Sequence, residues 1–183
     1  MAPRATKNDY FDVAMRVLAE EGYPALKQAN LCKALGVTTG SFYNHFQNWQ
    51  DFTGQLLDKW RKERTSLLAA AASRTNDPAK ALDLLRELAL SLPHRAEAAI
   101  RAWSLIDPQV AEVQALVDRE RLDAVQHAMD ALFSDRETST GYARTAFYVL
   151  VGFEQFEGDS TDPHHLNWAF RRLLEHIEER RDL

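Results

Sequence analysis

Residues 31–46, LCKALGVTTGSFYNHF, constrain the fold of this chain more than any other stretch. A helical pattern runs to Leu35 and stops at Gly36, where glycine can adopt the left-handed conformation that ends a helix. Thr38 can then cap a second, short helix over residues 39–46. Two helices joined by a short turn that contains glycine are typical of a helix-turn-helix, whose second helix can enter the DNA major groove.

The second helix of this motif has two different faces. Phe42 and Phe46 are four positions apart and share one face, which should form a small core with Leu31 and Val37. The opposite face has no acidic residue and carries groups able to donate to phosphates or base edges, at Thr39, Gly40, Tyr43 and Asn44. The same face would also suit the solvated surface of a helical bundle.

The rest of the chain predicts an all-α protein of about nine helices, because no strand-type alternation is present and the prolines fall at helix starts. We expect an N-terminal three-helix DNA-binding domain over residues 1–48. A helical ligand-binding and dimerisation domain should follow over residues 49–183, entered by a long linking helix from about 49 to 72. A polar turn at 158–161 should separate the last two helices.

The helix expected over about 140–157 is apolar on every side between residues 146 and 153, so it has no free solvent face. Together with the last helix, over about 163–180, it predicts a four-helix interface with a second copy of the chain. The alternative is that this helix forms the centre of a monomer's core. The expected interface residues are Val149, Gly152, Phe153, Phe156, Phe170, Leu173 and Ile177.

Charge is divided unevenly along the chain, whose net charge is −5. Residues 1–65 carry nine lysines and arginines against seven acidic residues, whereas the remainder carries thirteen against twenty. An acidic half repels phosphates, so any DNA contact is expected near the N-terminus. The single cysteine, Cys32, fits a buried structural thiol in a reducing cytoplasm, where we expect the protein to be located. The sequence predicts neither a signal peptide nor a membrane helix.

No enzyme is predicted, because no nucleophile motif, phosphate loop or carboxylate pair stands out. No cofactor or metal is expected either, since His164, His165 and His176 lack metal-ligand spacing. Polar groups among aromatic side chains, on the helices expected to begin at about residues 93 and 140, are candidates for a small-molecule pocket, although each residue taken singly fits core or interface better. They are His94, Arg101, Trp103, Tyr142, Phe147 and Tyr148.

The order of elements and the motif GVTTGSFYNHF at 36–46 resemble the TetR family of bacterial transcriptional regulators. The first helix, ending in Glu21-Gly22-Tyr23, fits as well, so the match covers about residues 6–60. The remainder resembles the family in length and helix layout, including the stretch RAWSLIDPQVAEV at 101–113.

The resemblance implies a homodimer that binds a palindromic operator, usually represses, and responds to a small ligand in its C-terminal domain. It places Thr38, Thr39 and Gly40 at the major groove. Tyr43 and His45 would contact phosphates. The sequence departs from the family pattern at two flanking positions. Lys27 stands where the family often has a hydroxyl, and we expect it to bind DNA there as a point charge for phosphate. Trp49 stands where the family often has lysine.

The sequence thus predicts a ligand-responsive transcriptional regulator whose partners are an operator in double-stranded DNA, an unidentified small-molecule effector and a second copy of itself. The alternative is a helical small-molecule-binding or interaction protein without a sequence-specific operator.

Overall fold

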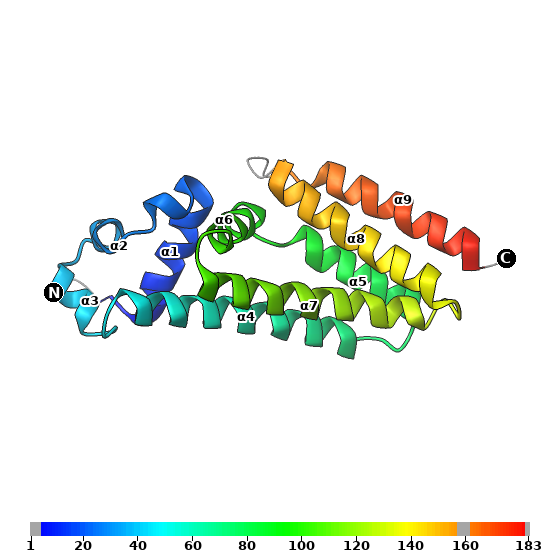
Figure 1. Ribbon diagram of the computed structural model, residues 1–183, viewed down its shortest axis with the longest axis horizontal. Coiled ribbons are helices and arrows are strands. Elements are labelled where there is room, and N and C mark those ends of the chain that lie inside the picture. The colour runs from blue at the N-terminus through cyan, green and yellow to red at the C-terminus, as the bar shows by residue number, and fades with distance from the viewer. Residues whose placement is uncertain (1–4, 157–161, 182–183) are drawn as a thin grey trace. The chain divides into compact units, whose positions relative to one another are not determined.

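The chain is helical throughout its described part. The computed structural model describes residues 5–156 and 162–181, which contain no strand (Figure 1). The predicted all-α class and number of helices are confirmed, whereas the turn predicted at 158–161 lies outside the described residues. The elements are α1 (Lys7–Glu21), the 3-10 turn η1 (Tyr23–Ala25), α2 (Gln28–Leu35), α3 (Thr39–Tyr43), α4 (Trp49–Ser73), α5 (Pro78–Leu90), α6 (His94–Ser104), α7 (Pro108–Asp130), α8 (Arg136–Phe156) and α9 (His164–Arg181).

Local capping chemistry sets several helix starts. The Oγ1 of Thr6 accepts a hydrogen bond from the backbone N–H of Asp9 (3.3 Å), and the Asp9 carboxylate accepts one from the backbone N–H of Thr6 (2.7 Å). This capping box satisfies two backbone donors at the start of α1. The carboxylate of Asp77 caps α5 in a similar way, and Pro78 opens that helix as predicted.

Two helix ends differ from their predicted positions. Helix α8 begins at Arg136 rather than near residue 140, because the carboxylate of Asp135 accepts the backbone N–H of Thr138 (2.9 Å) and caps the helix. Helix α3 ends at Tyr43 rather than at residue 46. The chain leaves the helix there to reach Asn48, whose side chain accepts the Asp51 N–H (2.8 Å) and caps α4.

The chain divides into two compact units. Unit 1 comprises Met1–Lys62 and Pro93–Gln114, and unit 2 comprises Glu63–Leu92 and Ala115–Leu183. This division differs from the predicted boundary between residues 48 and 49, since α6 and the first half of α4 belong with the N-terminal helices.

Helix α6 joins unit 1 because it packs along α1. The ring of Trp103 on α6 stacks on Tyr23, with ring centroids 4.6 Å apart and planes 15° apart. On the same helix, the buried Glu97 accepts a hydrogen bond from the indole Nε1 of Trp60 (2.9 Å). Apolar spacing along α6 predicts a buried face, but it does not indicate which helix covers that face.

An aromatic cluster forms the core beneath the helix-turn-helix. Tyr10, Phe42, Phe46 and Phe52 are each at most 2% exposed. The Tyr10 and Phe42 rings meet edge to face with centroids 5.6 Å apart, and Phe46 and Phe52 do so at 5.0 Å. The predicted burial of Phe42, Phe46 and Leu31 is confirmed, whereas Val37 is only half-buried.

Unit 2 is a helical layer in which α8 lies beside α9 and α5 contacts α9 (Figure 1). One buried cluster gathers around Met129 and Ile177, and a second around Leu150, Phe153 and Phe170. In the described residues, no helix combines the length and the apolar character that crossing a membrane requires.

Gly22 ends α1 in a backbone conformation that is restricted to glycine, with φ 76° and ψ 178°. Gly22→Ala should therefore lower the free energy of unfolding by about 1–3 kcal/mol. The matched control is Gly54→Ala, at an exposed glycine inside α4 whose added Cβ would meet no atom within 4 Å. That change should raise stability by up to about 1 kcal/mol. Urea unfolding of both variants should show changes of opposite sign in the free energy of unfolding. Changes of the same sign would contradict this account of the Gly22 turn.

Candidate nucleic-acid interface

The turn between α2 and α3 has the geometry of a helix-turn-helix. Gly36 adopts the left-handed conformation (φ 66°, ψ 29°), and the N–H of Val37 bonds back to the carbonyl of Cys32 (3.0 Å). Two residues later, Thr38 caps α3 by accepting the Ser41 N–H through its Oγ1 (3.4 Å). The turn is therefore closed by hydrogen bonds on both sides, which fixes the direction in which α3 leaves it.

The outer side of α3 faces solvent, while its inner side is anchored in the core. Phe42 is fully buried, whereas the next residue, Tyr43, is 55% exposed. The other candidate residues on this helix and its cap are exposed as well, at Thr38, Thr39, Gly40 and Asn44. They form one polar surface on a short helix whose position is fixed by aromatic packing.

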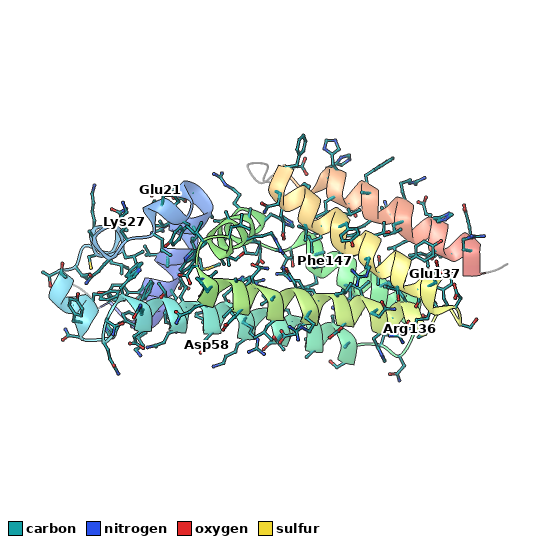
Figure 2. The ribbon with its side chains drawn as sticks, viewed as in Figure 1. Glu21, Lys27, Asp58, Arg136, Glu137 and Phe147 are labelled. Carbon is teal, nitrogen blue, oxygen red and sulfur yellow. The ribbon has the colours of Figure 1, made fainter. Side chains whose placement is uncertain are left out.

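The charge around this surface is suited to a polyanion. The sequence has no acidic residue between Glu21 and Asp51, and both lysines of that interval, Lys27 and Lys33, are exposed. Lys27 is the N-cap position of α2, makes no capping bond there and lies at the surface (Figure 2). Its ammonium is thus available near the helix-turn-helix as a point charge for phosphate.

His45 occupies a more internal position than the resemblance implies. Its Nε2 lies 2.8 Å from the carbonyl oxygen of Ala5, and its half-buried ring tilts against Tyr10. A carbonyl only accepts, so Nε2 donates this hydrogen bond. This nitrogen therefore holds the segment that precedes α1 and is not the one that could be offered to a phosphate.

Trp49, which stands at a family phosphate-contact position, is half-buried at the start of α4. Its ring packs on Phe52, with centroids 5.0 Å apart, and stacks on Phe42 at 6.2 Å. The tryptophan therefore extends the aromatic core towards the surface. Next to it, the backbone N–H of Gln47 and then the side chain of Gln55 stabilise the carboxylate of Asp51 and lower its pKa.

Unit 2 contains a cavity of about 80 Å³. Of the six predicted ligand residues, only Phe147 on α8 lines it (Figure 2). The complete lining is Arg64, Leu67, Leu68, Leu82, Leu85, Arg86, Leu88, Ala89, Leu92, Arg121, Val125, Met129, Ala146, Phe147, Leu150, Phe170, Leu173 and Leu174. Sequence reasoning missed the three arginines, because a charged residue on a helix is ordinarily read as facing solvent.

The other five predicted ligand residues lie elsewhere. His94, Arg101 and Trp103 are in α6 and therefore in unit 1, not in the unit that holds the cavity. Tyr142 stacks on Phe133, with centroids 5.2 Å apart, and Tyr148 is 62% exposed. The structure thus does not bring the six residues together, because the α6 face expected to line a pocket is used for packing on α1.

The residues predicted for a dimer interface fall into two groups. Phe153, Phe170 and Ile177 are buried within unit 2, and Val149 and Leu173 are partly buried in the same clusters. Only Gly152 and Phe156 are exposed on the outer side of α8. Tyr148 and Trp168, which were not among the predicted interface residues, are more than half exposed. Both residues lie outside the apolar spacing that marks the inward-packing face of their helix, and this position in the sequence could have identified them as exposed.

Cys32 is buried on α2, and its burial raises the pKa of its thiol. The described residues contain no group of three or more histidine, cysteine or acidic side chains placed to hold a metal ion.

The short helix α3 is capped and rests on an aromatic core, in a stretch of sequence without acidic residues. This unit has the architecture of a helix-turn-helix domain, and the chain continues into a second helical unit that contains a cavity. Residues 11–52 match the family model described as bacterial regulatory proteins, tetR family. This match covers the helix-turn-helix and its flanking helices, and the fold of the chain is one that TetR-family regulators share.

Solved structures share the fold over almost the whole chain. A transcriptional regulator from Rhodococcus sp. Rha1 is 18% identical, with 96% of this chain and 97% of that chain covered and a TM-score of 0.79. A TetR transcriptional regulator from Legionella pneumophila is 13% identical over 98% and 99% of the two chains, with a TM-score of 0.78. A TetR-family regulator from Streptomyces coelicolor is 17% identical over 93% of each chain, with a TM-score of 0.78. No curated protein sequence matches the chain.

Proposed function

We propose that the chain is a cytoplasmic, non-enzymatic transcriptional repressor that binds a palindromic operator as a homodimer and is released by a small molecule bound in unit 2. The observation that carries the proposal is the exposed, acid-free outer side of α3, anchored by the buried Phe42 on its inner side. Thr38, Thr39 and Gly40 would meet base edges in the major groove, and Tyr43, Asn44 and Lys27 would meet the phosphates that flank them.

The outer side of α8 and α9 supports a homodimer. Tyr148, Phe156 and Trp168 are 62%, 89% and 61% exposed, an unusual amount of exposed aromatic surface for two neighbouring helices of a monomer. Gly152 lies on the same side of α8, and its added Cβ would meet no atom within 4 Å. A second copy could therefore approach the helix closely here and cover the aromatic rings. This assignment replaces the buried Phe153, Phe170 and Ile177 with Tyr148 and Trp168 as interface residues.

The cavity supports an effector site in unit 2. Two continuous helices connect unit 2 to unit 1, which contains the helix-turn-helix. Helices α4 and α7 each begin in unit 1 and end in unit 2. A ligand shifts the protein away from its DNA-binding state only if it binds the other state more tightly. We propose that filling the cavity favours the state in which the two recognition helices are no longer one DNA turn apart.

The proposal is tested by selecting operator sequences from random double-stranded DNA with the full-length protein. An inverted repeat should be enriched, with half-sites about 34–36 Å apart, one helical turn. Absence of any enriched repeat would contradict the proposal and favour a helical small-molecule-binding protein without an operator, for which the cavity alone would account.

Two substitutions on α3 should distinguish contacts that recognise the base sequence from contacts to the DNA phosphates. Thr39→Ala should change the preferred base at one position of each half-site, with a loss of about 1–3 kcal/mol in discrimination. Tyr43→Phe removes one hydroxyl donor. It should weaken binding to all DNA sequences to a similar extent without changing the enriched motif. Tyr142→Phe, the same change at a tyrosine of α8 whose ring stacks on Phe133 within the subunit, is the control and should leave DNA affinity unchanged. Repeating the selection with each variant checks these roles, and a reversed pattern would contradict them.

A further inference from the structure

We propose that the unit 2 cavity binds a small neutral apolar molecule of about three to five non-hydrogen atoms, a short hydrocarbon or halocarbon, and discriminates against ions and hydrogen-bonding molecules. This inference rests on the proposed function insofar as the cavity is the effector site, and it adds the size and the chemical class of the effector.

The wall of the cavity is almost wholly apolar. Fifteen of its eighteen lining residues are leucine, alanine, valine, methionine or phenylalanine, and the lining contains no acidic residue and no uncharged polar side chain. An amine or a polyol that entered this cavity would lose its hydrogen bonds to water without gaining a side-chain acceptor in exchange. The composition of the wall therefore favours a ligand that has no polar group to satisfy.

The other three lining residues are arginines, and each of them interacts with the protein itself. Arg86 donates through Nε to the carboxylate of Asp83 (2.8 Å) and through Nη1 to the side-chain oxygen of Asn167 (2.8 Å). Arg64 and Arg121 also interact with other groups of the chain. Because the cavity surface is almost wholly apolar, the arginines contribute mainly their hydrocarbon stems to it. An anion would have to compete with the existing partners of these arginines, whereas a neutral apolar ligand leaves those partners in place.

A cavity with this wall is also unfavourable for water. A buried water molecule typically makes about three hydrogen bonds, and the apolar side chains that form most of the wall offer none. An apolar ligand needs no such partner, because it gains dispersion contacts with the wall and leaves water on binding. The cavity should therefore prefer an apolar molecule to a polar molecule of the same size.

The volume of the cavity limits the size of the ligand. The cavity measures about 80 Å³, whereas an engineered apolar cavity of roughly 150 Å³ accepts benzene, a ring of six carbons. In proportion to volume, the unit 2 cavity holds about three such atoms. The flexible side chain of Met129 in the wall can adjust around a ligand, which extends the upper limit to about five atoms.

The position of the cavity allows an apolar ligand to act on several helices at once. Its wall combines residues from α4, α5, α7, α8 and α9. Two of these helices, α4 and α7, continue into unit 1. A ligand that only fills space can therefore favour one arrangement of these helices over another without making a polar contact.

Methyl NMR of the full-length protein, without DNA and with ¹³C in the methionine methyl groups, tests the inference. Met129 lines the cavity, and Met15, on α1 in unit 1, is the internal control. Cyclopropane and dichloromethane are the hydrocarbon and halocarbon probes, and acetamide is a polar probe of similar size. At least one of the two apolar probes should shift the Met129 signal in a saturable manner and leave Met15 unchanged, and the comparison identifies the preferred source. Acetamide should shift neither signal, and benzene should bind at least tenfold more weakly than the preferred probe.

Three outcomes would overturn the proposal. The first is the absence of a saturable Met129 shift with both apolar probes. The second is an equal shift with acetamide, which would contradict the preference for apolar molecules. The third is benzene binding as tightly as the preferred probe, which would contradict the limit on size.

Two substitutions in the wall should change the volume in opposite directions. Ala146→Leu adds three carbon atoms at a lining position and should weaken binding of the preferred probe at least tenfold. Leu88→Ala enlarges the cavity and should strengthen benzene binding at least tenfold. Ala69→Leu, at an exposed position of α4 outside the lining, is the matched control and should change neither affinity.

The two wall variants keep the test independent of folding, because an overpacked Ala146→Leu that unfolds leaves Leu88→Ala as the decisive variant. Circular dichroism verifies the folded state of each. An unchanged affinity in folded Ala146→Leu, or no gain of benzene binding in folded Leu88→Ala, would overturn the assignment of the ligand to this cavity.

Failure of this inference and failure of the proposed function are distinguishable. Binding of an apolar probe that leaves operator affinity unchanged would keep the ligand class and remove the effector role. An enriched operator without binding of any apolar probe would keep the regulator and remove the ligand class.

Discussion

Phe42→Ala should lower the free energy of unfolding by about 3–5 kcal/mol and abolish specific DNA binding. The ring is fully buried, and its centroid lies 4.9 Å from that of Phe46, 5.5 Å from Phe52 and 5.6 Å from Tyr10. Removing it leaves a cavity under the recognition helix, and a helix of only five residues has little stability of its own. The orientation of α3 should therefore be lost together with the stability.

Denaturant unfolding followed by tryptophan fluorescence measures this effect. Of the four tryptophans, Trp49, Trp60 and Trp103 lie in unit 1 and only Trp168 lies in unit 2, so the signal reports mainly on the affected unit. The control is Tyr43→Ala at the next position, which is 55% exposed. It should change stability by less than about 0.5 kcal/mol while weakening DNA binding. A similar loss of stability in both variants would mean that α3 is not anchored by its inner face.

The helix-turn-helix could be predicted from sequence because its determinants are local. The end of α2 at Leu35 and the cap of α3 at Thr38 depend on Gly36 and on a threonine within a few residues of the turn. The end of α3 was harder to locate. Phe46 continues the helical spacing of Phe42, and its burial was predicted correctly, but the chain reaches that position through a turn.

Partners between distant helices could not be predicted in the same way. The spacing of α6 indicates a buried face at Trp103, and the aromatic character of that face suggested a ligand pocket. Its partner is Tyr23, eighty positions earlier, and the ring stacking between them is a long-range contact that periodicity does not encode. The cavity in unit 2 illustrates the same limit, since Arg64 and Arg121 line it although a charged side chain on a helix is ordinarily expected to face solvent.

A helix that is apolar on all sides poses a further difficulty, because spacing alone does not tell which face packs within the subunit. In α8 the adjacent residues Gly152 and Phe153 were both assigned to an interface. The structure buries Phe153 in its own unit and exposes Gly152. This distinction makes Gly152 the position where the proposed dimer can be tested without disturbing the subunit's core.

Gly152→Leu should raise the dissociation constant of the proposed dimer at least 100-fold, about 2.7 kcal/mol, while leaving the subunit folded. A side chain at this position meets no atom of its own subunit within 4 Å, so the change should not overpack the core. Replacing a glycine inside a helix should instead favour the helix by up to about 1 kcal/mol. The added volume would occupy the space that the partner's helix needs, so stability of the subunit and stability of the dimer should change in opposite directions.

Sedimentation velocity across a range of protein concentrations measures the dimer, and helical circular dichroism verifies that the variant is folded. Gly54→Leu makes the same change at an exposed glycine of α4, also without an atom within 4 Å, and should leave the dimer intact. Gly152→Ala provides an intermediate volume and should weaken the dimer less than leucine does. If Gly152→Leu sediments as an unchanged dimer, the outer side of α8 is not the interface, and the exposed Tyr148 and Phe156 require another partner. If it sediments as a folded monomer, operator affinity should fall with it, because each half-site would then be bound by an independent subunit without the gain from linked binding.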